Sequence, residues 1–308
     1  MEKEKGVLMM KRGWSVTFVS MGLSVGLLFG CSDDAEHQNE EEAADDTMEE
    51  ADQLTEEEIH WNSGVAYFNR MPMTRYMLDA EDMSEITEEW LVVDLRDPSD
   101  FELQALPDAH HASWQDVAER LASLPQNEPV LWVSADGQTA SMVMAMTRMA
   151  GLDSYVLAGG MENWEGGTEK GSKWLEDELT GADVVRHDSH ESEVMMNRAE
   201  GVLSQGIEQS LFLLSPDELN EKLDELYVVD TRSEADYQSS HLPGAHHYPV
   251  ADLGLSMGDL PDDKPLMVYC YSGQTGAQAA SVLRMAGFDA YSLKGGMGSW
   301  ENDDFEIE

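Results

Sequence analysis

The stretch PLMVYCYSGQTGAQAASVLRMAG, residues 265–287, predicts the fold of half of this 308-residue chain. Its first six residues are an apolar run typical of a buried parallel strand. A short loop follows, and a helix is expected from about Thr275 to Gly287, where a helix C-cap belongs. Alternating strands and helices predict an α/β fold with a mostly parallel sheet that helices cover on both faces.

The same unit occurs twice in the chain. Residues 129–151 read PVLWVSADGQTASMVMAMTRMAG, 136 positions before the first stretch. Residues 90–165 and 226–301 align at this single offset without a gap, and 29 of the 76 positions are identical. A period of this length indicates two copies of one domain and not a solenoid. We therefore predict two domains of the same α/β type.

The N-terminal segment has the pattern of an export signal. Residues 1–12 are basic, residues 13–30 are uncharged and apolar or small, and Cys31 follows. The sequence LFGC at 28–31 resembles the lipobox of bacterial lipoproteins. This resemblance implies a lipoprotein-type signal peptide over 1–30 and lipidation of Cys31; an uncleaved membrane anchor is the alternative. Translation could start at Met1, Met9 or Met10.

The chain is strongly acidic, with 62 Asp and Glu against 18 Lys and Arg and a net charge of −44. Residues 31–59 are so acidic and poor in apolar side chains that we predict a disordered tether there. Such a charge repels nucleic acid, so no nucleic-acid partner is expected. It also suits a high-salt habitat, where screening shortens self-repulsion. The expected organisation after the tether is a domain at 60–166, a linker at 167–189 and a domain at 190–308.

Cys270 is the candidate nucleophile. It ends a predicted strand and faces a helix N-terminus, which is the ligand-binding edge of an α/β sheet. Loop N–H groups and the helix dipole favour an anion there, and such a setting lowers a thiol pKa from about 8.5 to roughly 3.5–7.5. Gly273 permits a turn with positive φ, and Ser272 and Thr275 offer hydroxyl groups. A buried structural cysteine is the alternative.

Three motifs resemble those of rhodanese domains. They read VVDTRSEADYQSSHLPGAHHYP at 228–249, CYSGQT at 270–275 and LKGGMGSWE at 293–301. The resemblance extends to both halves and implies sulfur transfer through a persulfide on Cys270. The donor would be thiosulfate, a polysulfide or a persulfide, and the acceptor a thiol or cyanide.

The resemblance also assigns roles to the residues around the thiol. The predicted substrate-binding loop consists of Tyr271, Ser272, Gly273, Gln274 and Thr275. Asp230 and Arg232 are expected to support the fold beside it, and His241 and Trp300 to be structural. No metal and no other cofactor is expected. The loop has Thr275 where many relatives have Arg, so anionic donors are expected to bind weakly.

The first copy has lost the nucleophile. Ser134 stands at the position of Cys270, and a serine without a general base is a poor nucleophile. Asp136 replaces Ser272 and brings a negative charge into the loop. The first domain resembles the inactive N-terminal domain of tandem sulfurtransferases, which implies a role in packing against the second domain.

These observations predict an extracytoplasmic sulfurtransferase. A lipid on Cys31 would anchor it at the cell surface or on the periplasmic face of a bacterial membrane. The alternative is a carrier of sulfane sulfur without turnover, or a redox or binding module that serves a membrane partner.

Overall fold

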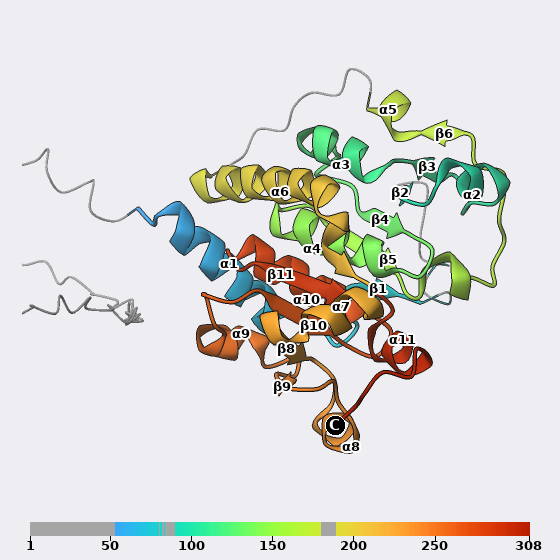
Figure 1. The fold of residues 1–308 in the computed structure, drawn as a ribbon. Helices are drawn as coiled ribbons and strands as arrows, with labels where there is room; N and C mark the ends of the chain where they lie inside the picture. The colour runs from blue at the N-terminus through green and yellow to red at the C-terminus, as the bar shows by residue number, and fades with distance from the viewer. Residues whose placement is uncertain (1–52, 80, 82, 84–89, 180–188) are drawn as a thin grey trace, which may run out of the picture. The chain divides into compact units, whose positions relative to one another are not determined.

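A computed structural model describes residues 53–79, 81, 83, 90–179 and 189–308. Two parallel sheets with flanking helices make up this part of the chain (Figure 1). The predicted signal peptide, Cys31 and the part of the predicted tether up to residue 52 lie outside the described residues. Within the described ranges, no helix has the length and apolar character needed to cross a membrane.

The first sheet has the strand order β1-β5-β4-β2-β3-β6, and every pair of neighbouring strands is parallel. Its strands are β1 (Met77–Leu78), β2 (Leu91–Asp94), β3 (His110–His111), β4 (Val130–Val133), β5 (Ser154–Leu157) and β6 (Lys173–Trp174). The helices of this half are α2 (Pro98–Leu103), α3 (Trp114–Arg120), α4 (Gln138–Met149) and α5 (Leu175–Glu178), with 3₁₀ turns at Leu121–Ser123 and Gly160–Asn163.

The second sheet repeats this arrangement with the order β7-β11-β10-β8-β9, again all parallel. Its strands are β7 (Leu213–Leu214), β8 (Tyr227–Asp230), β9 (His246–His247), β10 (Leu266–Tyr269) and β11 (Ala290–Leu293). Its helices are α7 (Pro216–Lys222), α8 (Glu234–Ser239), α9 (Leu253–Ser256), α10 (Gln274–Met285) and α11 (Gly296–Asn302), with 3₁₀ turns at Ser210–Phe212, Leu223–Glu225 and Met257–Asp259. The predicted α/β fold class is confirmed.

Local sequence signals account for these elements. All four residues of the central strands β4 and β10 are buried, because helices cover both faces of each sheet, and this explains their unbroken apolar runs. Helix α7 begins with the predicted capping box: Ser215 Oγ accepts the N–H of Glu218, and the Glu218 carboxylate accepts the N–H of Ser215. Pro216 takes the first helical position, where its missing N–H costs no hydrogen bond.

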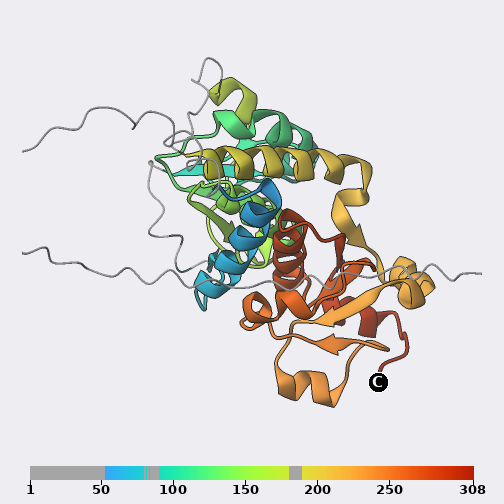
Figure 2. The same cartoon turned by 90° about the vertical axis from the view of Figure 1, so that its left-hand side faces the viewer.

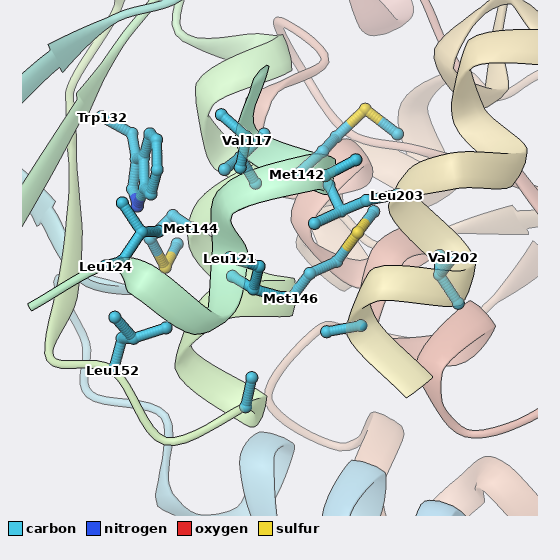
Figure 3. Packing of buried hydrophobic residues seen from close by; sticks show 14 of the residues in the cluster. Val117, Leu121, Leu124, Trp132, Met142, Met144, Met146, Leu152, Val202 and Leu203 are labelled. Carbon is cyan, nitrogen blue, oxygen red and sulfur yellow. The ribbon is translucent and has the colours of Figure 1, made fainter. Parts of the chain in front are cut away.

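Two further helices, α1 (Glu56–Arg70) and α6 (His190–Glu208), connect the two halves. Helix α1 precedes the first sheet in the chain, yet Tyr67 and Phe68 belong to a buried cluster made mostly by the second half. Helix α6 precedes the second sheet, yet Val202 and Leu203 pack with α4 in the core of the first half (Figure 3). Helix α1 therefore packs on the second half, and helix α6 packs on the first half, as Figure 2 also shows. Each of these helices is next in sequence to the half that it does not cover.

The structure shifts the predicted domain limits. Helical structure begins at Glu56, ahead of the expected start at residue 60, because Thr55 and Glu58 form a capping box and Ile59 is buried. The expected linker at 167–189 contains β6, which pairs with β3, and the buried Leu175 of α5. These residues have partners in the first half, so they extend the first domain.

The position of α1 leads to a stability prediction. Replacing Phe68 by Ala is expected to lower the free energy of unfolding by about 3–5 kcal/mol, because a buried aromatic ring is lost from the core of the second half. Urea unfolding followed by circular dichroism measures the change. Met73→Ala is the control, since Met73 is 94% exposed and its loss leaves no cavity. A loss below about 1 kcal/mol for Phe68→Ala would contradict the packing of α1.

Candidate active site

Cys270 directly follows β10 and lies where the carboxyl end of the central strand meets the start of α10. The residue is only 4% exposed and, in the part of the chain that the structure describes, forms no disulfide. Gly273, the N-cap of α10, has a φ of 91°, a left-handed conformation that favours glycine. The predicted strand–loop–helix geometry around the thiol is thus present.

Four backbone amides surround the sulfur. The backbone N–H groups of Ser272, Gly273, Thr275 and Gly276 are directed at the Cys270 sulfur and favour its charged form. Gly276 lies one residue beyond the predicted loop. A Cβ at Gly276 would sit 3.1 Å from the Cα of Tyr269, so the missing side chain lets the helix start close against the strand. A small residue directly after the loop was the signal in the sequence for this fourth donor.

The pKa of Cys270 differs from the sequence-based expectation. Burial raises the pKa of the Cys270 thiol above its ordinary value, and the four amides oppose this effect without overcoming it. Desolvation penalises the charged thiolate more than the neutral thiol, and it increases with burial. The loop sequence predicted amides near the sulfur, but it did not predict how deeply the thiol is buried. The expected lowering of the pKa of Cys270 is therefore wrong.

The third sequence motif forms a turn that holds the thiol loop. The N–H of Met297 donates to the carbonyl of Cys270 at 2.8 Å, and the N–H of Gly298 donates to the carbonyl of Tyr271 at 3.0 Å. A Cβ on Gly296 would lie 2.5 Å from the Gly273 nitrogen, so only glycine lets this turn approach so closely. Residues 295–298 therefore support the loop from behind and do not form a separate site.

Tyr271 forms the exposed side of the loop. Its ring is half-exposed, and its hydroxyl donates to Asp236 Oδ2 at 2.5 Å and accepts the N–H of Ser233 at 3.2 Å. Hydrogen bonds from Ser233 and Tyr271 hold the pKa of Asp236 below its ordinary value. The Asp236 carboxylate is thus hydrogen-bonded to the loop, while residues 271–276 contain no Lys or Arg.

Asp230 and Arg232 brace the domain beside the loop. The Arg232 guanidinium makes a bidentate contact with the Asp230 carboxylate, with Nη2 2.7 Å from Oδ2, and also donates to the Ser240 carbonyl. Tyr269 donates its hydroxyl to Asp230 at 2.5 Å. The first copy contains the same ion pair, Arg96 on Asp94, although it has no thiol. Its presence in both copies supports the expected bracing role.

The two residues expected to be structural contact the end of the chain. His241 lies 3.6 Å from the carboxylate of Glu308 and is stacked on Tyr237. Trp300 is fully buried and donates its indole N–H to the carbonyl of Glu306. Both contacts anchor the C-terminal segment.

Gln274 does not belong with the predicted substrate-binding residues. Its side-chain nitrogen donates to the carbonyl of Leu157 at 3.2 Å, and its side-chain oxygen accepts the N–H of Gly159 at 3.0 Å. Both partners are in the first half, so the Gln274 side chain points across the domain interface. The sequence could not show this, because the direction of a side chain at a helix start depends on what packs there.

The first copy forms a similar loop with different chemistry. Ser134 is buried at the position of Cys270, and its Oγ accepts the N–H of Ala140. Asp136 Oδ1 accepts the N–H of Gln138 at 2.9 Å, so a carboxylate already occupies the start of α4. The structure thus adds a physical reason to the predicted inactivity of this copy: its loop contains its own anion.

Comparison with known proteins agrees with this geometry. The model of the rhodanese-like domain family matches residues 79–166 and 215–303, one match in each half. Two parallel sheets of the same strand order at their cores, one of them with a thiol in its central loop, define a tandem α/β protein. This chain belongs to the rhodanese-like domain family.

Curated relatives share one part of the chain. A tRNA sulfurtransferase from Desulfurococcus amylolyticus is 37% identical over 95 residues, which are 28% of this chain and 19% of that protein. A tRNA sulfurtransferase from Pyrobaculum aerophilum is 32% identical over 126 residues, 40% of this chain and 26% of that protein. The chain thus spans about a fifth to a quarter of the length of these relatives.

Solved structures give similar partial matches. A rhodanese-related protein from Thermoplasma volcanium is 22% identical with a TM-score of 0.30, over 31% of this chain and 95% of that one. A rhodanese-like domain protein from Staphylococcus aureus is 25% identical with a TM-score of 0.28, over 29% of this chain and 89% of that one.

The buried thiol leads to a pH prediction. Because the pKa of Cys270 is raised and the thiolate is the nucleophile, alkylation of Cys270 by iodoacetamide should rise about tenfold per pH unit up to pH 8 and beyond. Mass spectrometry of the Cys270 peptide measures the rate at this residue alone. Free cysteine is the reference, and a rate that levels off below about pH 8 would show a lowered pKa instead.

Proposed function

We propose that the chain is a sulfurtransferase that carries a sulfane sulfur as a persulfide on Cys270. The observation that supports this most directly is the set of four amides directed at the Cys270 sulfur. Membership of the rhodanese-like domain family and the sulfurtransferase names of the relatives support sulfur transfer in general. Donor, acceptor and location are proposed below from the chemistry of the chain.

The reaction proceeds in two displacements without net oxidation. The Cys270 thiolate attacks the outer sulfur of thiosulfate; a new S–S bond forms, and sulfite leaves with the electron pair of the old one. The amides of Ser272, Gly273, Thr275 and Gly276 stabilise the persulfide anion that results. Cyanide or an acceptor thiolate then takes the terminal sulfur, and the Cys270 thiolate is regenerated.

The charge around the loop bears on the choice of donor. The Asp236 carboxylate accepts a hydrogen bond from Tyr271, and residues 271–276 contain no Lys or Arg. The net charge of the whole chain is −44. A doubly charged donor such as thiosulfate is therefore repelled, more strongly at low salt. We propose that polysulfides or persulfides of lower charge are better donors, and that thiosulfate works best at high salt.

The negative charge of the chain argues against RNA as its substrate, although the relatives are named tRNA sulfurtransferases. RNA binding rests on basic groups that neutralise phosphates, and this chain has 18 Lys and Arg against 62 Asp and Glu. We propose a thiol or another small acceptor and no nucleic acid. We further propose an extracytoplasmic protein whose lipidated Cys31 anchors it to a bacterial membrane; residues 1–30 support this through their signal-like pattern.

One observation favours a second candidate, a sulfur carrier without turnover of its own. Cys270 is 4% exposed and its pKa is raised, so small acceptors would react slowly unless a partner protein opens the loop. A stable persulfide without turnover would be the signature of this carrier.

The sulfurtransferase proposal is tested by sulfur transfer from thiosulfate, and separately from polysulfide, to cyanide. Wild type and Cys270→Ser are compared at low and at molar salt, with mass spectrometry for one added sulfur on Cys270. We expect turnover that requires Cys270 and, for thiosulfate, increases with salt. A persulfide without turnover would favour the carrier. Absence of an adduct with either donor would overturn the sulfur chemistry.

The first copy provides a matched test of the loop. In the Cys270→Ser background, Ser134→Cys places a thiol at the corresponding position of the first half. We expect no recovery of turnover, because the Asp136 carboxylate occupies the start of α4 and repels an anionic sulfur. The cyanide assay measures this, and recovery of more than about a tenth of wild-type turnover would show that the loop of the first copy is competent.

A further inference from the structure

The two copies hold each other through a reciprocal pair of glutamines. Gln138 at the start of α4 reaches into the second half: its side-chain oxygen accepts the N–H of Gly295 at 3.0 Å, and its nitrogen donates to the carbonyl of Leu293 at 2.9 Å. Gln274 makes the corresponding contacts with Gly159 and Leu157 in the first half. Both glutamines are buried, at 1% and 6% exposure.

These contacts place Gln138 directly against the thiol loop. A Cβ on Gly273 would lie 2.7 Å from Gln138 Nε2, so the amide of Gln138 packs on the backbone of a residue that donates to the Cys270 sulfur. The loop can make this approach only because Gly273 has no side chain. Gln138 therefore touches the active loop, although it belongs to the copy without a thiol.

A second path connects Gln138 with the sulfur. Gln138 fixes the N–H of Gly295 at the start of the turn that supports the loop. The same turn donates from Met297 to the carbonyl of Cys270 and from Gly298 to the carbonyl of Tyr271. Each hydrogen bond fixes the tilt of the peptide plane to which the carbonyl belongs. The plane of the Tyr271 carbonyl also carries the N–H of Ser272 that points at the sulfur.

We propose that Gln138 is a positioning residue for the Cys270 site, supplied by the thiol-free domain. It keeps the Gly273 backbone and the 295–298 turn in the arrangement in which the amides converge on the sulfur. The Gly-Gln-Thr sequence at 137–139 thus has a function in the first copy, although that copy has no cysteine in its loop. The inference deepens the proposed function, but it concerns the thiol itself and is tested without a sulfur donor.

The test compares two buried glutamines of the same interface. Gln138→Met keeps the volume and removes the hydrogen bonds to Leu293 and Gly295. Gln278→Met is the matched control: Gln278 lies on α10, one turn after Gln274, and donates to the Tyr67 hydroxyl and the Arg75 carbonyl, away from the loop. The measurement is the rate of iodoacetamide alkylation at Cys270 from about pH 6 to 10, with urea unfolding of each variant.

Gln138→Met is expected to raise the apparent pKa of Cys270 by about one unit, which lowers alkylation near pH 8 about tenfold. Gln278→Met should stay within about twofold of wild type even if it unfolds at lower urea. An unchanged alkylation profile for Gln138→Met would overturn the proposal, whatever the sulfur-transfer assays show. If Gln138→Met does not fold, Gln138→Asn, one methylene shorter, is expected to show the same shift, and a wild-type profile there would overturn it equally.

Discussion

The packing of α4 against α10 is the contact on which the rest of the structure depends. Eleven of the twelve residues of α10 are buried, so this helix is covered on all sides: by its own sheet, by α4 and by α1. A helix buried in this way cannot present a polar face, and its few polar side chains need partners inside the protein. Gln274 and Gln278 find them in the first half and in α1, which ties the two copies together. The Cys270 loop opens from the N-terminus of this buried helix, and the thiol therefore inherits its low solvent exposure.

Burial at this point has two opposing effects on the chemistry. It raises the cost of the thiolate, which is why the pKa of Cys270 is raised in spite of four amide donors. It also removes competing water, so the same amides interact more strongly with any anion that forms on the sulfur.

The duplication explains why one copy could lose its nucleophile and remain. Its strands, its Asp94–Arg96 ion pair and its Gly-Gln-Thr loop are still present, and all of them serve the fold or the interface. In the loop itself, Ser134 stands in place of the cysteine, and Asp136 brings a carboxylate to the start of α4. The exchange of α1 and α6 between the halves strengthens the same dependence, because each core contains a helix adjacent in sequence to the other. Each half therefore depends on a helix adjacent in sequence to the other half to complete its buried core.

By itself, the sequence determined what is local or repeated. The 136-residue offset, the apolar strands, the capping box at Ser215 and the place of Cys270 between strand and helix all depend on neighbours within a few residues. The same holds for the predicted inactivity of the first loop, since Ser134 and Asp136 align directly with Cys270 and Ser272. Only the tertiary structure decided which half α1 and α6 cover, where Gln274 points, and that burial outweighs the amides at the thiol. These properties depend on residues far away in the chain, because desolvation and side-chain partners are set by whatever packs against a group and not by its neighbours in sequence.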